Sequence, residues 1–515
     1  SPDAALKDGF GDVAEKLPFE NDSPIRGIDL RTALHYYEGD TSNQITGKVT
    51  KVIYALNKEY PDIVDEYNGT LVDVEQDVDV YAYYVPNGTD YDVYFLADDT
   101  IYSPRDSSTL YKNMKALQYV DTHNYDVSRV ETMHELFRYC HSLKEIDVSH
   151  WDVSNVTVMS SVFDECKVLP ELDVSKWNTH KAETMAYMFY GCPALQTLDV
   201  SGWDVSNVTT MRGMFMDCTS LANIDVGNWN TGKVTDMGFM FRACFALEWI
   251  DVSNWDTGNV TAFNSMFSDS KSNRGRMKIN NLDFSKWDMS SATNISYMFY
   301  GCGQMTDLDL SGWDVSKVTT MNHTFCDCFM MENYNFSGWN TESLTIMNGI
   351  FNGNNSLKRV DLSDFDTQNV YDFMQVFDGC YSLEEIIGLD QWDTSSGDRF
   401  GEFLTNSKVR EIDLSSFDMS NVVYTKRMFY ANSELTTIYV GDNWNLDIST
   451  LDTTSSNASW SGVTNMFENN PKLTGANGST PASFGTTATT GALYARVDTE
   501  ETPGLLTHIN DKPNP

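Results

Sequence analysis

The chain repeats one pattern of apolar and polar positions about every 26 residues. A bulky aromatic residue marks each repeat, and most steps between markers are 26 residues, with one step of 32. The markers are Tyr125, Trp151, Trp177, Trp203, Trp229, Trp255, Trp287, Trp313, Trp339, Phe365, Trp392, Phe417 and Trp444. A period of this length predicts small units that stack, because each unit is too short to bury its own apolar face.

Each repeat combines two periodicities. The first is a set of apolar residues spaced as one face of a helix, as in Met133, Phe137 and Cys140. The second is an L-x-x-L-x-L pattern whose last members alternate as in a half-buried strand, as in Leu143, Ile146 and Val148. Ser154, Asn155 and Thr157 then suit the N-cap of the next helix. The sequence therefore predicts an α/β solenoid of about 13 repeats of 26 residues, with short parallel strands on one face and short helices on the other.

Two columns of the repeat are expected to be buried. One is a phenylalanine in every repeat, which includes Phe215 and, by its spacing, Phe403; Leu221 opens a strand pattern beside it. The other holds eight of the nine cysteines, and Ser270, Asn354, Asn406 and Asn432 replace cysteine in the remaining repeats. A disulfide framework would not tolerate such replacement, so we expect small, reduced, buried side chains.

The two ends fall outside the period. Residues 1–100 predict an α+β capping domain, with a helix from Val49 to Tyr60 and a hairpin whose strands run from Val78 to Val85 and from Tyr91 to Leu96. This region is alternatively an independent binding module. Residues 101–475 form the repeat array, and residues 476–515 form a C-terminal cap and tail with a last strand at Ala492 to Val497.

Composition narrows the class of partner. The 515 residues carry a formal net charge of −39, with 41% hydrophobic and 13% aromatic residues, as in a folded acidic protein. A surface this acidic excludes nucleic acid and disfavours anionic lipid, but it favours cations and basic partners. The sequence contains no apolar run of the roughly 18 residues that a membrane span needs.

One repeat resembles a known family. Residues 208–221 read VTTMRGMFMDCTSL, and Ile224, Asp225, Val226 and Trp229 follow. This unit is similar to the BspA-like leucine-rich repeat bacterial surface proteins, and the resemblance spans about residues 100–475. It implies secretion, an extracellular location on the bacterial cell surface, and adhesion to host protein or to other cells. It implies no particular ligand.

Two acidic columns are candidate metal sites. The first lies between the inward residues of each strand and includes Asp199, Asp225 and Asp251, which we expect to point outward. Neighbouring carboxylates repel each other, so a row of Ca²⁺ ions is one interpretation, and hydrogen bonds from adjacent serines, such as Ser149 and Ser175, are the other. The second column follows each marker and holds only Asp or Asn, which favours a turn role over metal binding.

Three further features are candidate binding sites. The marker tryptophans would bind glycans if they were exposed, although their replacement by phenylalanine favours packing. Trp249 occupies a slot that is polar elsewhere, so an exposed Trp249 with Asn223, Asn281, Asp225 and Asp251 would form a protein-binding hot spot; the alternative is a ring lying flat on the next repeat. The insertion of residues 268–278 carries Lys271, Arg274, Arg276 and Lys278, either as a docking site or as a solvated loop.

Enzyme motifs are absent from the sequence. There is no phosphate-binding loop, no H-E-x-x-H and no G-x-S-x-G. We therefore expect a non-enzymatic surface protein without an obligatory cofactor that binds a protein or another cell-surface macromolecule through its strand face and loops. A self-assembling homo-oligomer or filament is the alternative function, and a glycan-binding module is a further one.

Overall fold

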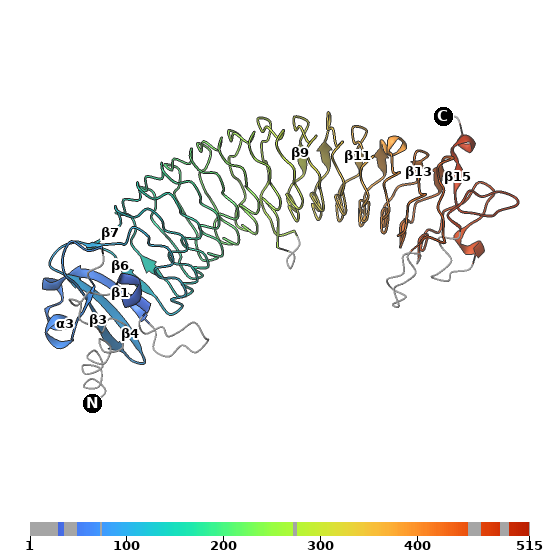
Figure 1. The fold of residues 1–515 in the computed structure, drawn as a ribbon. Coiled ribbons are helices and arrows are strands. Elements are labelled where there is room, and N and C mark those ends of the chain that lie inside the picture. The colour runs from blue at the N-terminus through green and yellow to red at the C-terminus, as the bar shows by residue number, and fades with distance from the viewer. Residues whose placement is uncertain are drawn as a thin grey trace. The chain divides into compact units, whose positions relative to one another are not determined.

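The computed structural model describes residues 29–35, 49–72, 75–270, 275–451, 465–484 and 494–513. The chain divides into two compact units, Ser1–Val234 and Thr235–Pro515, and each unit is described by itself (Figure 1). The described chain contains no helix with the length and apolar character that crossing a membrane requires.

The first unit opens with a mixed sheet. Its N-terminal elements are α2 (Leu30–His35), β1 (Val49–Leu56), η1 (Asn57–Glu59), α3 (Pro61–Glu66), β2 (Thr70–Val72), β3 (Val80–Asn87), β4 (Asp90–Ala97) and β5 (Ile101–Tyr102). The strand order is β2-β3-β4-β1-β6-β8, in which β6 (Tyr119–Asp121) and β8 (Glu145–Ile146) belong to the repeats. Because β1 pairs in parallel with β6, the N-terminal sheet continues directly into the repeat strands.

The predicted helix from Val49 to Tyr60 is wrong, because Val49–Leu56 is strand β1. This strand lies between β4 and β6 and is buried along most of its length. A strand covered on both faces is an almost continuous apolar run, and its spacing also fits one face of a helix. The predicted hairpin is confirmed, since β3 and β4 pair antiparallel from Val80–Ala97 to Asn87–Asp90.

The repeats are successive coils of chain joined by short parallel strands. In the first unit, single-residue bridges link Thr132 to Val158 and Val158 to Thr184. In the second unit, the paired strands are β9 (Asp307–Asp309) with β10 (Asn333–Asn335), β11 (Arg359–Asp361) with β12 (Glu385–Ile387), and β13 (Glu411–Leu414) with β14 (Thr437–Val440). Tandem repetition with parallel strands is therefore present in both units.

The short helices predicted for each repeat are absent from the described coils. Instead, alternate backbone N–H groups donate across to the next coil, such as Met133 to Val158, Glu135 to Ser160 and Phe137 to Val162, at 2.8–2.9 Å. The intervening N–H groups close tight turns within the coil, as Leu136 does on Met133 and Cys140 does on Phe137. A row of such turns buries every fourth residue, so its apolar pattern matches that of a helix.

The turn row requires left-handed backbone at two positions in most coils. In the coil from Glu131 to Val156 these positions are Glu135 and Tyr139, with φ of 57° and 65°. Equivalent positions hold Gly191, Gly213, Gly301, Gly349, Gly353 and Gly379, which adopt positive φ without steric cost. The residues predicted as helix caps have other roles. Asn155 Nδ2 donates to the Ser128 carbonyl and Thr157 Oγ1 donates to the Glu131 carbonyl, both on the preceding coil, whereas the Ser154 N–H donates to Asp152 Oδ1 within its own turn.

Aromatic columns form the core of each unit. Phe163, Phe189 and Phe215 stack at centroid distances of 5.8 Å with their rings within 5° of parallel. Phe215 and Leu221 are both buried, as predicted. The described marker rings are buried as well, apart from the half-buried Trp444.

The cysteine column is a column of hydrogen-bond donors. The described cysteines are buried and free of disulfides, as predicted. Cys192 Sγ donates to the Phe163 carbonyl of the preceding coil at 3.1 Å, and Asn354 Nδ2 donates to the equivalent Phe325 carbonyl at 2.7 Å. The slot therefore selects a small side chain that carries a donor hydrogen, which explains why asparagine can replace cysteine.

One coil departs from the predicted alignment. Leu404, rather than Phe403, donates its N–H to the Met428 carbonyl, so Leu404 occupies the phenylalanine position. Accordingly, Ser407 occupies the cysteine slot and is buried, whereas Asn406 lies at a left-handed position with φ 53°. The step of 27 residues between Phe365 and Trp392 displaces this coil by one position relative to the sequence pattern.

The remaining elements are β7 (Tyr125–Asp126), η2 (Leu389–Gln391), η3 (Pro481–Phe484), β15 (Thr507–His508) and η5 (Ile509–Asp511). Strand β15 pairs in parallel with β14 and covers the edge of the last repeat sheet. The strand predicted at Ala492 to Val497 is not formed in its described part, where Val497 makes only an isolated bridge to Leu506; residues 492 and 493 lie outside the described chain.

Candidate functional site

The outward Asp column is held by hydrogen bonds within each coil. Asp251 Oδ1 accepts from the Ser253 N–H at 3.0 Å and from Ser253 Oγ at 2.7 Å, and Asp199 is held in the same way by Ser201. Asp225 accepts only the Gly227 N–H, at 3.3 Å. The Ser253 hydrogen bonds hold the pKa of Asp251 below its ordinary value, because they stabilise its ionised carboxylate.

The serine interpretation of this column therefore has direct support, and the cation row has none. Asp147 and Asp173 are bonded by Ser149 and Ser175, as the sequence suggested. Among the residues that the structure describes, no group of three or more His, Cys, Asp or Glu side chains is arranged to hold a metal ion.

The second Asp and Asn column has the predicted turn role. Asp152 Oδ1 accepts the Ser154 N–H at 3.0 Å, and Asn340 Oδ1 accepts the Glu342 N–H at 3.0 Å. A neutral amide and a carboxylate make the same bond, so the turn requires the side-chain oxygen and not the charge.

The marker tryptophans form a packing column. Trp177 and Trp203 stack 6.1 Å apart with rings 4° from parallel, and the Trp203 Nε1–H donates to the Val174 carbonyl at 3.0 Å. The faces of these two rings cover each other, and both indole N–H groups donate to the preceding coil. A sugar ring therefore has no access to the buried part of this column, so the glycan interpretation is wrong for these rings.

Trp249 is the exception, with 59% of its surface exposed. It lies in the second unit at the slot equivalent to the outward positions of the repeat strands, although residues 247–252 form no strand. Glu248 beside it is exposed, Asp251 is half-buried and Asn281 is exposed. The predicted partners Asn223 and Asp225 are exposed in the first unit, so the candidate residues are divided between the two units. A ring lying flat on the next coil would also expose one face, so this alternative stays open beside the hot-spot interpretation.

The described part of the insertion contacts the rest of the second unit through Arg276 and Lys278. Lys271 and Arg274 lie outside the described residues. The Arg276 guanidinium lies 4.3 Å above the ring of Phe245, and the Arg276 N–H donates to Asp269 Oδ2 at 2.8 Å. Lys278 Nζ lies 3.4 Å from Glu248 Oε1. The two described basic side chains are thus already engaged within the unit.

The strand beside Trp249 is irregular. Asn281, at the slot equivalent to Trp249, has a left-handed backbone with φ 54°, and residues 279–284 form no regular strand. Its Nδ2 donates to Asn280 Oδ1 at 2.8 Å. Trp249, the irregular segment and the insertion therefore fall in adjacent coils, a juxtaposition that the step of 32 residues between Trp255 and Trp287 could have signalled.

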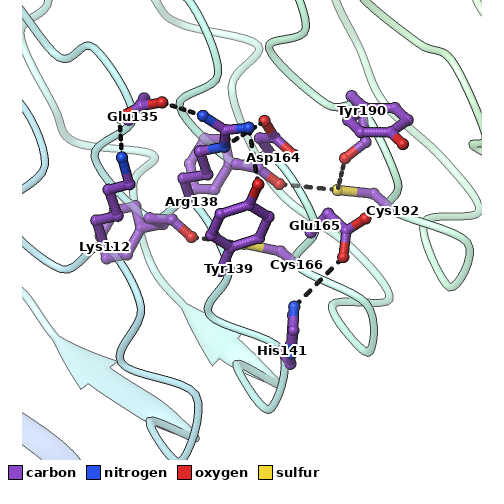
Figure 2. A network of polar contacts seen from close by, with 12 residues as sticks. Lys112, Glu135, Arg138, Tyr139, His141, Asp164, Glu165, Cys166, Tyr190 and Cys192 are labelled. Atoms are coloured by element: carbon purple, nitrogen blue, oxygen red, sulfur yellow. Dashed lines mark hydrogen bonds and ion pairs between the residues drawn. The ribbon is translucent and has the colours of Figure 1, made fainter. Parts of the chain in front are cut away.

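A second cluster of polar side chains lies in the first unit (Figure 2). Glu135 forms ion pairs with two side chains, Lys112, whose Nζ lies 2.5 Å from Glu135 Oε2, and Arg138. Arg138 Nε lies 2.9 Å from Asp164 Oδ2, and its NH2 donates to the Tyr139 hydroxyl at 2.8 Å. Sequence reasoning missed this network, because its members come from three successive coils and form no local motif.

Burial destabilises the ionised form of Asp164, the buried carboxylate of this network. Asp164 is 1% exposed and its Oδ1 has no hydrogen-bond partner in the described chain. Burial raises the pKa of Asp164 to about 6, although Arg138 opposes the rise. Burial raises the pKa of the neighbouring Cys166 and Cys192 thiols well above its ordinary value. The geometry favours a structural network that links coils.

The fold defines a tandem-repeat protein with parallel strands. The chain belongs to the family described as "Mycoplasma protein of unknown function, DUF285", whose model matches residues 105–220, 193–282, 273–388 and 347–473. These overlapping matches cover the repeats and more than half of the chain. No curated protein matches the chain.

Proposed function

We propose that this chain is a non-enzymatic binding protein of the bacterial cell surface that captures a macromolecular partner through the outward strand face and loops of a solenoid. The observation that carries the proposal is Trp249, which exposes 59% of its surface although the described marker tryptophans around the repeat are mostly buried. Exposing an indole to water is unfavourable, and tryptophan is among the side chains that contribute most to interfaces.

The surface location rests on the resemblance to BspA-like proteins. That resemblance lies in residues 208–221 and their equivalents, and it supports secretion and adhesion as the setting in which such a face would act. The helical side of a leucine-rich repeat is replaced here by turns, but the strand side of the coil, which would carry the partner, is common to both.

Site-specific photo-crosslinking tests the proposal. A benzophenone amino acid is placed at position 249, and at position 381 as the control, because Tyr381 is also an exposed aromatic side chain of the second unit. Both proteins are incubated with intact cells and with extracellular matrix proteins. We expect adducts from position 249 that position 381 does not give, and equal labelling from both positions would contradict a specific face.

The same experiment separates the alternative functions. Adducts between two copies of the chain through position 249, together with a mass in light scattering that rises with concentration, would favour self-assembly over capture of another molecule. Binding to a glycan array that Trp249→Ala abolishes would favour the glycan-binding alternative.

A further inference from the structure

We infer that the face around Trp249 binds an extended polypeptide segment rich in arginine and lysine. This inference rests on the proposed function and specifies its partner. The face, named here the acidic strand face, lies within the second unit and consists of Glu248, Trp249, Asp251, Asn281, Asp283, Asp307, Asp309 and Glu332.

The first argument is charge. Six of the eight side chains of the acidic strand face are carboxylates, and all eight are exposed except Asp251, which is half-buried. Hydrogen bonds keep three of the carboxylates ionised: those from Ser253, Ser285 and the Asn333 amide hold the pKa values of Asp251, Asp283 and Asp307 below their ordinary range. In the part of the chain that the structure describes, two lysines lie nearby, Lys278 beside Glu248 and Lys286 beside Asp251 and Asp283. A negative surplus remains on the face.

The second argument is the aromatic ring among these charges. An indole attracts a guanidinium or ammonium group through its negative face, and tryptophan does so more strongly than the other aromatic residues. The unit already shows this contact elsewhere, where Arg276 lies 4.3 Å above Phe245. A basic side chain placed on Trp249 would meet the ring and the neighbouring carboxylates together. A neutral or acidic partner would gain only one of these interactions, or would be repelled.

The third argument is the regular spacing of the outward side chains. Asp307 and Asn333, and likewise Asp309 and Asn335, are direct partners on adjacent parallel strands β9 and β10. Adjacent strands lie about 4.8 Å apart, so a chain that crosses them passes an acidic or amide side chain at each step. An extended peptide can place successive basic side chains over successive coils, which a compact cation could not do.

Fluorescence anisotropy with the whole chain tests the inference. The probe is a labelled ten-residue peptide of alternating arginine, lysine and serine, and the control peptide carries glutamate in place of the basic residues. We expect saturable binding of the basic peptide alone, and weakening of more than about fivefold when NaCl is raised from about 50 to about 500 mM.

Matched variants separate the ring from the charges. Trp249→Ala is expected to weaken binding at least about fivefold, and Trp249→Phe by less. Asp283→Asn with Asp309→Asn is expected to weaken binding and flatten its salt dependence. Tyr381→Ala and Glu500→Gln are the controls, since both residues are exposed outside the acidic strand face. Unchanged melting temperatures verify that the variants fold.

Three outcomes overturn the inference: no binding of the basic peptide, equal binding of the acidic peptide, or binding that Trp249→Ala leaves intact. These failures are distinguishable from failure of the proposed function. A partner crosslinked at position 249 without any affinity for the basic peptide would keep the capture function and remove only the basic class of partner.

Discussion

At the scale of single residues, the repeat columns are selected for hydrogen bonds as well as for volume. The marker tryptophans show this best, because Trp339 makes an indole hydrogen bond that Trp392 lacks among the described residues. Trp339 Nε1 donates to the Leu310 carbonyl at 2.9 Å, whereas Trp392 Nε1 is buried without a hydrogen-bond partner in the described chain. Both rings are buried, so a change to phenylalanine removes a similar area from each.

We therefore predict that Trp339→Phe lowers the free energy of unfolding by about 1 kcal/mol more than Trp392→Phe. The additional loss arises because Trp339→Phe removes a buried hydrogen bond to the Leu310 carbonyl, which in the described chain keeps only the bond from the Trp313 N–H. Urea denaturation followed by circular dichroism measures both variants. Equal losses would show that ring packing alone determines this column.

The pH dependence of Asp164 gives a second prediction at this scale. Its pKa in the folded protein is about 6, above the value of 3.8 for a free side chain, so the folded state binds the proton more tightly. Asp164 therefore makes the free energy of unfolding fall as the pH rises from about 4 to about 6, by at most about 3 kcal/mol. Asp164→Asn is expected to remove this fall.

Urea midpoints of the two proteins at pH 4.5 and 7.5 measure the difference, since the other carboxylates titrate alike in both. If Asp164→Asn kept the full pH dependence of the free energy of unfolding, that dependence would originate from another group. Asp152→Asn is a suitable control. The Ser154 hydrogen bonds lower the pKa of Asp152, so this carboxyl titrates below the range from pH 4.5 to 7.5.

At the scale of the elements, the turn row explains why glycine recurs at fixed places in the coil. Gly301 has φ 73°, and a Cβ there would lie 2.5 Å from the Asp269 Cβ of the preceding coil. The glycine thus leaves room for the Asp269 side chain of the preceding coil.

Gly301→Ala is accordingly expected to lower the free energy of unfolding by about 1–3 kcal/mol, through strained backbone and the contact with Asp269. Gly312→Ala is the control, since a Cβ at Gly312 meets nothing within 4 Å. Thermal melting of both variants tests the contrast, and a neutral Gly301→Ala would mean that the coil spacing adjusts freely.

At the scale of the whole molecule, each unit contains an end of the repeat array that is covered by paired backbone. In the first unit β1 pairs with β6, and in the second unit β15 pairs with β14. The second contact is reinforced by side chains: His508 Nε2 lies 3.0 Å from Asp442 Oδ1, and Lys512 Nζ lies 2.9 Å from Asp413 Oδ2.

Removal of residues 494–515 is expected to produce concentration-dependent association, because the exposed edge of β14 can pair with another chain. Light scattering over a tenfold range of concentration measures it, with His508→Gln as a control that keeps the strand. A truncated chain that stays monomeric would show that β15 is dispensable as a cover.

The sequence alone determined the repeat length, the buried columns and the Asp and Asn turns, because these depend on the period and on the polarity of single side chains. The exposure of Trp249 came from the tertiary structure, since the sequence left two arrangements of this ring open. The tertiary structure decided whether Met133 to Cys140 forms a helix or a row of turns, and whether Val49–Leu56 is a helix or a strand. In both cases the apolar spacing fits either answer, and the choice depends on where the backbone N–H groups find acceptors. Those acceptors lie on the next coil or on the neighbouring strand, some 25 to 70 residues away along the chain.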